Sequence, residues 1–158
     1  MKNKGKLYTL CALLCLFVIF FDQTTKWSIL AFLPSGSVVN ICPYFNLVLT
    51  FNFGTSFGLL LPSTDIQYYL IVILTILCIS FLTYAFFKFK STLEKVSCSI
   101  LIGGSIGNLL DRFLQGAVVD FIDIHYNNWH WPAFNIADTC ISCSVIFLIV
   151  YNLSSKNT

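Results

Sequence analysis

Residues 66–87 constrain the fold most, because twenty-two consecutive positions there carry no charged side chain. An α-helix needs about 20 predominantly apolar residues to cross the hydrocarbon core of a bilayer. Three further segments are almost as apolar, each with its few charges near one end: residues 7–29, 96–114 and 136–153. We therefore expect an all-α integral membrane protein with four transmembrane helices.

The composition of the 158 residues supports this class. Apolar residues make up 57% of the chain and charged residues 10%, against about 45–50% and about 25% in soluble domains. Such a chain is not disordered, not a secreted disulfide scaffold, and not a nucleic-acid binder with a basic surface. No repeat or linker interrupts it, so we expect one membrane-embedded domain over residues 1–158. The basic, apolar start resembles a signal peptide, but no small-x-small cleavage site follows it, and we expect an uncleaved first helix.

The positions of the lysines predict the orientation of the spans. The connections at 30–65 and 115–135 contain no Lys or Arg. Lysines instead precede the first span, separate the second from the third and follow the fourth: Lys2, Lys4, Lys6, Lys88, Lys90, Lys95 and Lys156. By the positive-inside rule, both termini and the central loop face the cytoplasm.

A fifth span within residues 44–61 is the main alternative. Pro43 and Pro62 bracket this segment, and its residues 47–53 are β-branched and aromatic, which favours extended structure over helix. A fifth span would also place the lysines of the central loop outside. We expect a strand and loop that lie against the membrane and are buried on protein.

Polar residues gather at one depth of the predicted bundle. Ionisable groups inside spans are costly and mark functional sites by default. The first, third and fourth helices bring such residues to a level just inside the outer face, and the inner halves of these helices carry nothing comparable: Asp22, Lys26, Asn108, Asp111, Arg112, Asp120 and Asp138.

Several of these residues have simpler interpretations. Asp22 and Lys26 are four residues apart on one helical face, where an ion pair is as reasonable as a role in the site. Arg112 could snorkel to the interface, although pairing with a carboxylate explains an outward arginine better. We interpret Asp111 as a solvated helix end and Asp123 as a surface charge.

Asp120 and Asp138 stand apart from the other acids. Asp120 lies in the apolar frame 118–122, where an isolated carboxylate is expensive. Asp138 begins a helix, where N-capping is the alternative explanation. If the intervening segment turns back, the two carboxylates meet and share a proton. One can then activate a water as general base while the protonated partner hydrogen-bonds the scissile carbonyl, which cleaves a peptide bond without a metal or a covalent intermediate.

Five strings occur in this order, and together they resemble the type II (lipoprotein) signal peptidases of bacteria: Asp22-Gln23-Thr24-Thr25-Lys26, Asn52-Phe53-Gly54-Thr55-Ser56-Phe57, Gly103 to Arg112 (GGSIGNLLDR), Val119-Asp120-Phe121 and Phe134-Asn135-Ile136-Ala137-Asp138. The resemblance implies an aspartyl endopeptidase of the bacterial inner membrane. Its substrates would be prolipoproteins, cut before a diacylglyceryl-modified cysteine. It implies no cofactor and no metal, and we expect a monomer surrounded by membrane lipids.

The resemblance also assigns residues. Asp120 and Asp138 match the catalytic pair, and residues 38–61 match a small β-cradle on the outer membrane face. The remaining motif positions surround the substrate channel and the dyad: Asp22, Lys26, Asn52, Gly54, Asn108, Arg112, Asn135 and Ala137. The three asparagines of this set could bind an extended signal-peptide backbone or could hold the carboxylates. Ser105 and the pair Thr55–Ser56 stand where alanines are common in the family.

Three rival functions have weaker support. Cys140 and Cys143 form a CxxC pattern typical of thiol oxidoreductases, but such an enzyme needs a second outward cysteine pair, and the outer loops offer only Cys42. A transporter or proton-relay subunit would spread polar residues along the full depth of a helix. A zinc site at His125 and His130 is less simple than an interfacial aromatic belt in that loop.

Overall fold

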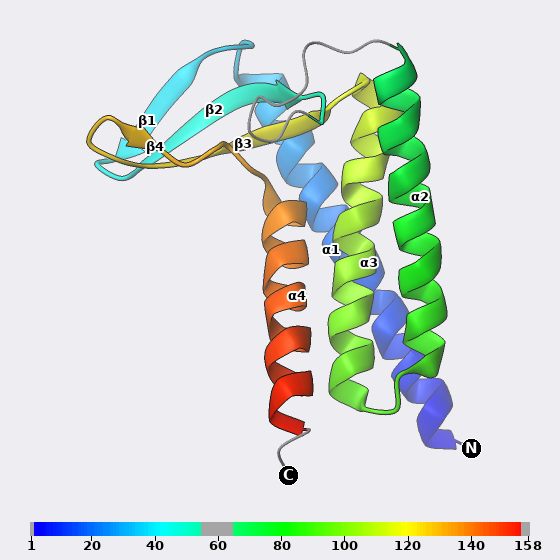
Figure 1. Cartoon of the computed structure of the whole chain (residues 1–158). Helices are drawn as coiled ribbons and strands as arrows, with labels where there is room; N and C mark the ends of the chain where they lie inside the picture. The colour runs from blue at the N-terminus through cyan, green and yellow to red at the C-terminus, as the bar shows by residue number, and fades with distance from the viewer. Residues whose placement is uncertain (1, 55–64, 156–158) are drawn as a thin grey trace.

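The computed structural model describes residues 2–54 and 65–155 and contains a helix at each predicted span (Figure 1). These helices are α1 (Lys2–Phe32), α2 (Asp65–Lys88), α3 (Thr92–Gln115) and α4 (Ile136–Ser155). By length and composition, three of them could cross a membrane, over Lys4–Phe32, Asp65–Lys88 and Ile136–Ser154. The chain is thus mostly helical and of membrane type.

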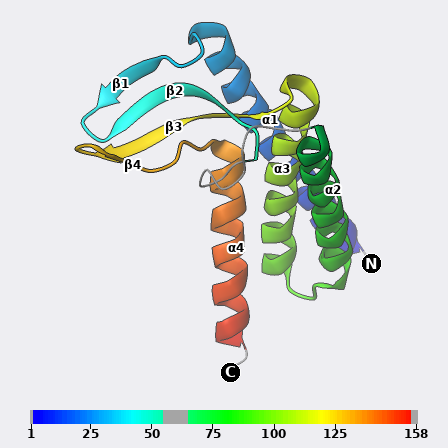
Figure 2. The ribbon, with the colours of Figure 1, turned by 45° about the horizontal axis from the view of Figure 1, so that its top comes forward.

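Helix α3 lies among the other helices, which explains why it is less apolar than they are (Figures 1 and 2). Its buried residues include charged and polar side chains such as Lys95, Asn108 and Asp111. These groups contact other helices: Lys95 donates to the backbone of α2, and Asn108 bonds Lys26 of α1 and Asp138 of α4. Polar groups can be buried in this way because they are hydrogen-bonded.

Glycines allow α3 to approach its neighbours closely. A Cβ at Gly103 would lie 2.8 Å from the backbone oxygen of Cys15 on α1, and a Cβ at Gly104 would lie 2.8 Å from the backbone oxygen of Ala137 on α4. Either contact is too short for a real side chain. The absence of a side chain at these two glycines therefore allows close packing at both interfaces.

The extended structure forms one antiparallel sheet in the order β1-β2-β3-β4, whose strands are β1 (Val38–Cys42), β2 (Phe45–Asn52), β3 (Val118–Tyr126) and β4 (Trp129–His130). The predicted extended segment 47–53 is confirmed in β2. The cradle predicted within residues 38–61 is present as β1 and β2, and the sheet extends beyond it, because β3 and β4 belong to the connection between α3 and α4. Residues 55–61 of the predicted cradle lie outside the described residues.

The sheet lies at one end of the helices (Figure 2), and its strand β3 contains Asp120. Its inner face packs on α1 through an apolar cluster of Ile29, Leu49, Val119 and Phe121. Strand β3 pairs with β2 so that Thr50 lies opposite Asp120. This pairing fixes the position of Asp120, because a slip of one residue would turn its side chain to the other face.

Candidate active site

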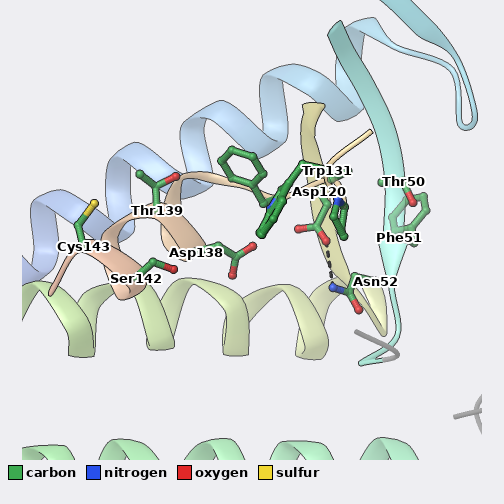
Figure 3. Close-up of a pocket in the computed structure, with 12 residues that line it drawn as sticks. Thr50, Phe51, Asn52, Asp120, Trp131, Asp138, Thr139, Ser142 and Cys143 are labelled. Atoms are coloured by element: carbon green, nitrogen blue, oxygen red, sulfur yellow. Dashed lines mark hydrogen bonds between the residues drawn. The ribbon is translucent and has the colours of Figure 1, made fainter. Parts of the chain in front are cut away.

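A cavity of about 650 Å³ lies between β2, β3 and the start of α4, and both Asp120 and Asp138 line it. In Figure 3 the two carboxylates face one another across this cavity. Thr50, Phe51 and Asn52 of β2 form one wall, and the α4 wall consists of Asp138, Thr139, Ser142 and Cys143. The two acids that the sequence singles out therefore share one cavity, although they come from different elements.

Asp120 is 2% exposed, and hydrogen bonds hold both of its oxygens. Nδ2 of Asn135 donates to Oδ1 at 2.7 Å, and Nδ2 of Asn52 donates to Oδ2 at 3.0 Å. Burial, followed by the negative charge of Asp138, raises the pKa of Asp120 to about 7, although the two amide hydrogen bonds act in the opposite direction. Asp120 is consequently suited to hold a proton near neutral pH.

Asp138 is half-buried and lies in the first turn of α4. Asn135 and Asp138 bond reciprocally: the backbone amide of Asp138 donates to Oδ1 of Asn135 at 2.9 Å, and the backbone amide of Asn135 donates to Oδ2 of Asp138 at 3.3 Å. This is the arrangement of a capping box. The alternative that Asp138 is itself the N-cap is therefore wrong, because Asn135 has that position.

Asn108 links the dyad to the bundle. Its Nδ2 donates to Oδ1 of Asp138 at 2.8 Å, while its Oδ1 accepts a hydrogen bond from Nζ of Lys26 at 3.0 Å. Asn135 is fully buried. All three predicted asparagines thus hold a dyad carboxylate in this structure, which is one of the two roles that the sequence leaves open.

Lys26 and two aspartates form a buried charged cluster beneath the dyad. Nζ of Lys26 lies 2.8 Å from Oδ2 of Asp22 and 2.7 Å from Oδ2 of Asp111. The exposed fraction of each of the three residues is 3% or less. The predicted Asp22–Lys26 ion pair is present. The interpretation of Asp111 as a solvated helix end is wrong, since a buried ammonium needs anionic partners and Asp111 supplies one.

This cluster also fixes the backbone on both sides of the dyad. Oδ1 of Asp22 accepts a hydrogen bond from the backbone amide of Ala137 at 2.9 Å, next to Asp138. Oδ2 of Asp111 accepts one from the backbone amide of Val119 at 3.1 Å, next to Asp120. Each carboxylate of the cluster therefore holds the residue that precedes one dyad aspartate.

Arg112 and Gly54 lie at the edge of this arrangement. Nη1 of Arg112 donates to the backbone oxygen of Asn108 at 3.0 Å. The prediction that Arg112 pairs with a carboxylate is wrong within the described residues, where the ion pairs involve Lys26 and His130. Gly54 has a φ of +93° and donates from its backbone amide to Oδ1 of Asn52. The turn that orients Asn52 therefore uses a backbone conformation that favours glycine.

Sequence reasoning did not identify Gln23 as part of the site. Nε2 of Gln23 donates to Oδ1 of Asp111 at 2.8 Å and to the backbone oxygen of Gly107 at 3.1 Å. Gln23 directly follows Asp22, and its position within a charged string in an apolar span is the signal that could have pointed to it.

Asp123 is also misassigned by the sequence. It is 6% exposed instead of lying at the surface. Asn46 donates to its Oδ2 at 2.8 Å, and Nδ1 of His130 lies 2.9 Å from its Oδ1. Burial alone would raise the pKa of Asp123, but the hydrogen bonds and the nearby histidines outweigh it and lower that pKa. Asp123 joins β2, β3 and β4 and does not line the cavity.

The residues present can supply acid–base chemistry on a bound peptide. Among residues 2–54 and 65–155, no group of three or more His, Cys, Asp and Glu side chains could hold a metal ion. The two histidines considered above as a zinc site, His125 and His130, stack on each other with ring centroids 4.9 Å apart. What the cavity offers is a pair of carboxylates, one of them with a raised pKa, held by amide groups.

Comparison with known proteins identifies the family. The family model for signal peptidase (SPase) II matches residues 14–154. A lipoprotein signal peptidase of Tolumonas auensis is 41% identical over 146 residues, which are 90% of this chain and 89% of that protein. One of Polynucleobacter necessarius is 40% identical over 139 residues, 86% of this chain and 84% of that protein.

A solved structure of a bacterial membrane enzyme shares the fold. It superposes with a TM-score of 0.81 at 34% identity and covers 92% of this chain and 93% of its own. The sequence match and the fold agree over nearly the whole length. The chain belongs to the signal peptidase II family, the aspartic proteases that remove signal peptides from prolipoproteins.

Proposed function

We propose that this signal peptidase cleaves prolipoproteins before a diacylglyceryl-modified cysteine, with Asp120 and Asp138 as its catalytic residues. The observation that carries the proposal is the shared cavity, into which both carboxylates project from different elements. Residues of β2 and of α4 line the cavity, and in this proposal an extended signal peptide lies between that strand and that helix. Ser142 and Cys143 would line the path of the peptide on the α4 side.

Asp120 holds the shared proton in the proposed reaction, because its pKa is raised to about 7. Asp138 takes a proton from a water, and the oxygen of that water attacks the scissile carbonyl carbon. The proton on Asp120 stabilises the negative charge that develops on the carbonyl oxygen. Asp138 then gives the proton that it took from the water to the peptide nitrogen, the carbon–nitrogen bond breaks, and the new carboxyl and amine products leave. No step uses a metal or a cofactor.

The other predicted site residues support this pair. Asn52, Asn108 and Asn135 orient the carboxylates through their amide groups. Asp22 and Lys26 do not contact the dyad directly. Asp22 accepts a hydrogen bond from the backbone amide of Ala137, and Lys26 donates one to Asn108. Gly54 shapes the turn that presents Asn52, and Arg112 holds the outer end of α3 through the backbone of Asn108.

We further propose that all four helices cross the bacterial inner membrane, with both termini in the cytoplasm and the dyad near the extracytoplasmic face. The distribution of lysines supports this orientation. The diacylglyceryl tails of the substrate would then stay in the outer leaflet while the peptide reaches the dyad. In this proposal the chain is a single domain that acts as a monomer among membrane lipids.

The test is reconstitution of the purified full chain with a diacylglyceryl-modified prolipoprotein. Mass spectrometry of the product should show a new N-terminus at the modified cysteine. The same precursor without the diacylglyceryl group is the matched control, and it should be cut poorly. Equal cleavage of both precursors, or cleavage at another bond, would contradict the proposed substrate.

A further inference from the structure

A second cavity, of about 710 Å³, lies at the end of the helices opposite to the dyad. It lies where the N-terminal turns of α1 meet the connection between α2 and α3, at the lower end of the molecule in Figure 1. Four lysines line it, namely Lys4, Lys88, Lys90 and Lys95, and none of its lining residues is acidic. We call it the lysine cavity.

Lys95 distinguishes this cavity from a group of surface lysines. It is 7% exposed, and its Nζ donates to the backbone oxygen of Phe86 at 2.7 Å. Its ammonium lies 4.9 Å from the ring centroid of Phe86 and 5.6 Å from that of Tyr8. Lys95 has no carboxylate partner within the described residues. A buried cation without an anion is costly, so an anion from outside the chain would stabilise it.

The nearest acid does not fill this role. Glu94 accepts a hydrogen bond from the backbone amide of Ser91 at 3.1 Å, which closes the capping box at the start of α3. Its carboxylate is thus engaged at the helix end, and Glu94 does not line the lysine cavity.

Apolar side chains indicate the kind of anion. Leu7, Tyr8 and Phe87 share the cavity wall with the lysines. The rings of Tyr8 and Phe87 meet edge to face at 6.3 Å, and Phe87 is 65% exposed. The apolar surface continues along both helices through exposed side chains such as Leu10 on α1 and Tyr84 on α2. A ligand with a phosphate group and hydrocarbon chains would match both the lysines and the apolar surface.

We propose that the lysine cavity binds the phosphodiester headgroup of an acidic phospholipid, whose acyl chains lie along α1 and α2. Lys95 and the three exposed lysines hold the phosphate. In the topology proposed above, this lipid belongs to the inner leaflet, but the binding site itself does not depend on that topology. The site is separate from the dyad and does not take part in cleavage.

The test is native mass spectrometry of the full chain in neutral detergent, titrated with phosphatidylglycerol or with phosphatidylcholine. Lys4→Gln is compared with Lys6→Gln, because both lysines are exposed on the same helix and only Lys4 lines the cavity. We expect a preference for phosphatidylglycerol that weakens about fivefold in Lys4→Gln and is unchanged in Lys6→Gln. The triple variant Lys4→Gln/Lys88→Gln/Lys90→Gln should abolish the preference.

Three outcomes would contradict the proposal. No preference for the acidic lipid, or equal loss in the two single variants, would mean diffuse attraction to positive charge. Full competition by glycerol phosphate without acyl chains would make the ligand a free phosphate ester. Cleavage of a lipidated precursor is measured on the same samples. A loss of lipid binding with intact cleavage therefore leaves the proposed peptidase function untouched, and the reverse result leaves the lipid site untouched.

Discussion

The side-chain amide of Asn135 donates to Oδ1 of Asp120 at 2.7 Å. Asn135 also caps α4, and its backbone amide bonds Asp138. One residue thus fixes the position of both dyad carboxylates relative to each other. This geometry explains how two aspartates from a strand and a helix can meet without a direct covalent or metal link.

Asn135→Asp separates the two roles of this residue. Aspartate is as good an N-cap as asparagine, so α4 should still form. The new carboxylate cannot donate to Asp120 and adds a third negative charge beside the dyad. We expect kcat to fall by about 10²-fold or more, as when a hydrogen-bond donor is removed from a catalytic site. The melting temperature should also decrease, because the new carboxylate is buried and the amide of Asn135 no longer donates to its neighbours.

The matched control is Asn128→Asp in the exposed turn of the hairpin, which makes the same chemical change away from the dyad. It should retain normal cleavage of a lipidated precursor. Normal activity in Asn135→Asp would show that the amide of Asn135 is not needed to position Asp120.

Activity should decline as the pH rises through about 7. The pKa of Asp120 is raised to about 7, so its proton is present below that pH and is lost above it. With both carboxylates ionised, no acid remains to stabilise the carbonyl oxygen, and kcat/KM should fall about tenfold per pH unit. A pH profile of a purified, detergent-stable enzyme measures this fall.

Asn52→Leu should move the fall in activity to higher pH. The amide of Asn52 donates to Asp120 and favours its ionised form, so removing the amide raises the pKa of Asp120 further. Leucine has a similar volume and keeps water out of the space. Asn40→Leu on the exposed strand β1 is the control and should leave the profile in place. A shift to lower pH in Asn52→Leu would contradict the assigned hydrogen bond.

Asp111→Asn should destabilise the protein strongly. The neutral amide cannot balance Lys26, whose ammonium is buried between Asp111 and Asp22. Breaking a buried ion pair costs about 3–5 kcal/mol, which should appear as a lower melting temperature in detergent. Asp65→Asn, at an exposed position in the first turn of α2, should melt like the parent. Equal melting temperatures for the two variants would exclude the proposed structural role of Asp111.

Gly104→Ala should impair cleavage by moving α4. The added methyl group would meet the backbone oxygen of Ala137 at 2.8 Å, so the helix that carries Asp138 must shift. Overpacking of this kind costs about 1–3 kcal/mol, and we expect kcat to decrease more than binding of the precursor. Gly5→Ala is the control, because nothing lies within 4 Å of a Cβ at that position. Full activity in Gly104→Ala would mean that the helix contact tolerates the extra atom.

The sequence predicts the helices well because lipid and the bundle core impose long apolar segments with few charges. It also singles out Asp120 and Asp138, since one lies in an apolar frame and the other at a helix start. It does not predict strand β3, because that strand pairs with β2, about 70 residues earlier in the chain. A propensity argument does not detect such a distant partner.

The wrong interpretations of Asp111 and Asp123 have the same cause. Asp111 and Asp123 both lie near the ends of apolar segments, where a solvated carboxylate is the usual expectation. Their partners, Lys26 for Asp111 and Asn46 for Asp123, are supplied by segments about 80 residues away. Burial of a charge depends on tertiary contacts, and nothing local in the sequence distinguishes a paired acid from a solvated one.

The most direct test of the account uses Asp120→Asn and Asp138→Asn in the purified, full-length protein, with Asp65→Asn as the exposed control. Both dyad variants should insert and fold, and neither should process a diacylglyceryl-modified precursor, whereas the control should process it at the parental rate. Mass spectrometry of the precursor after prolonged incubation provides the measurement. Processing at a near-normal rate by either folded dyad variant would contradict the catalytic assignment.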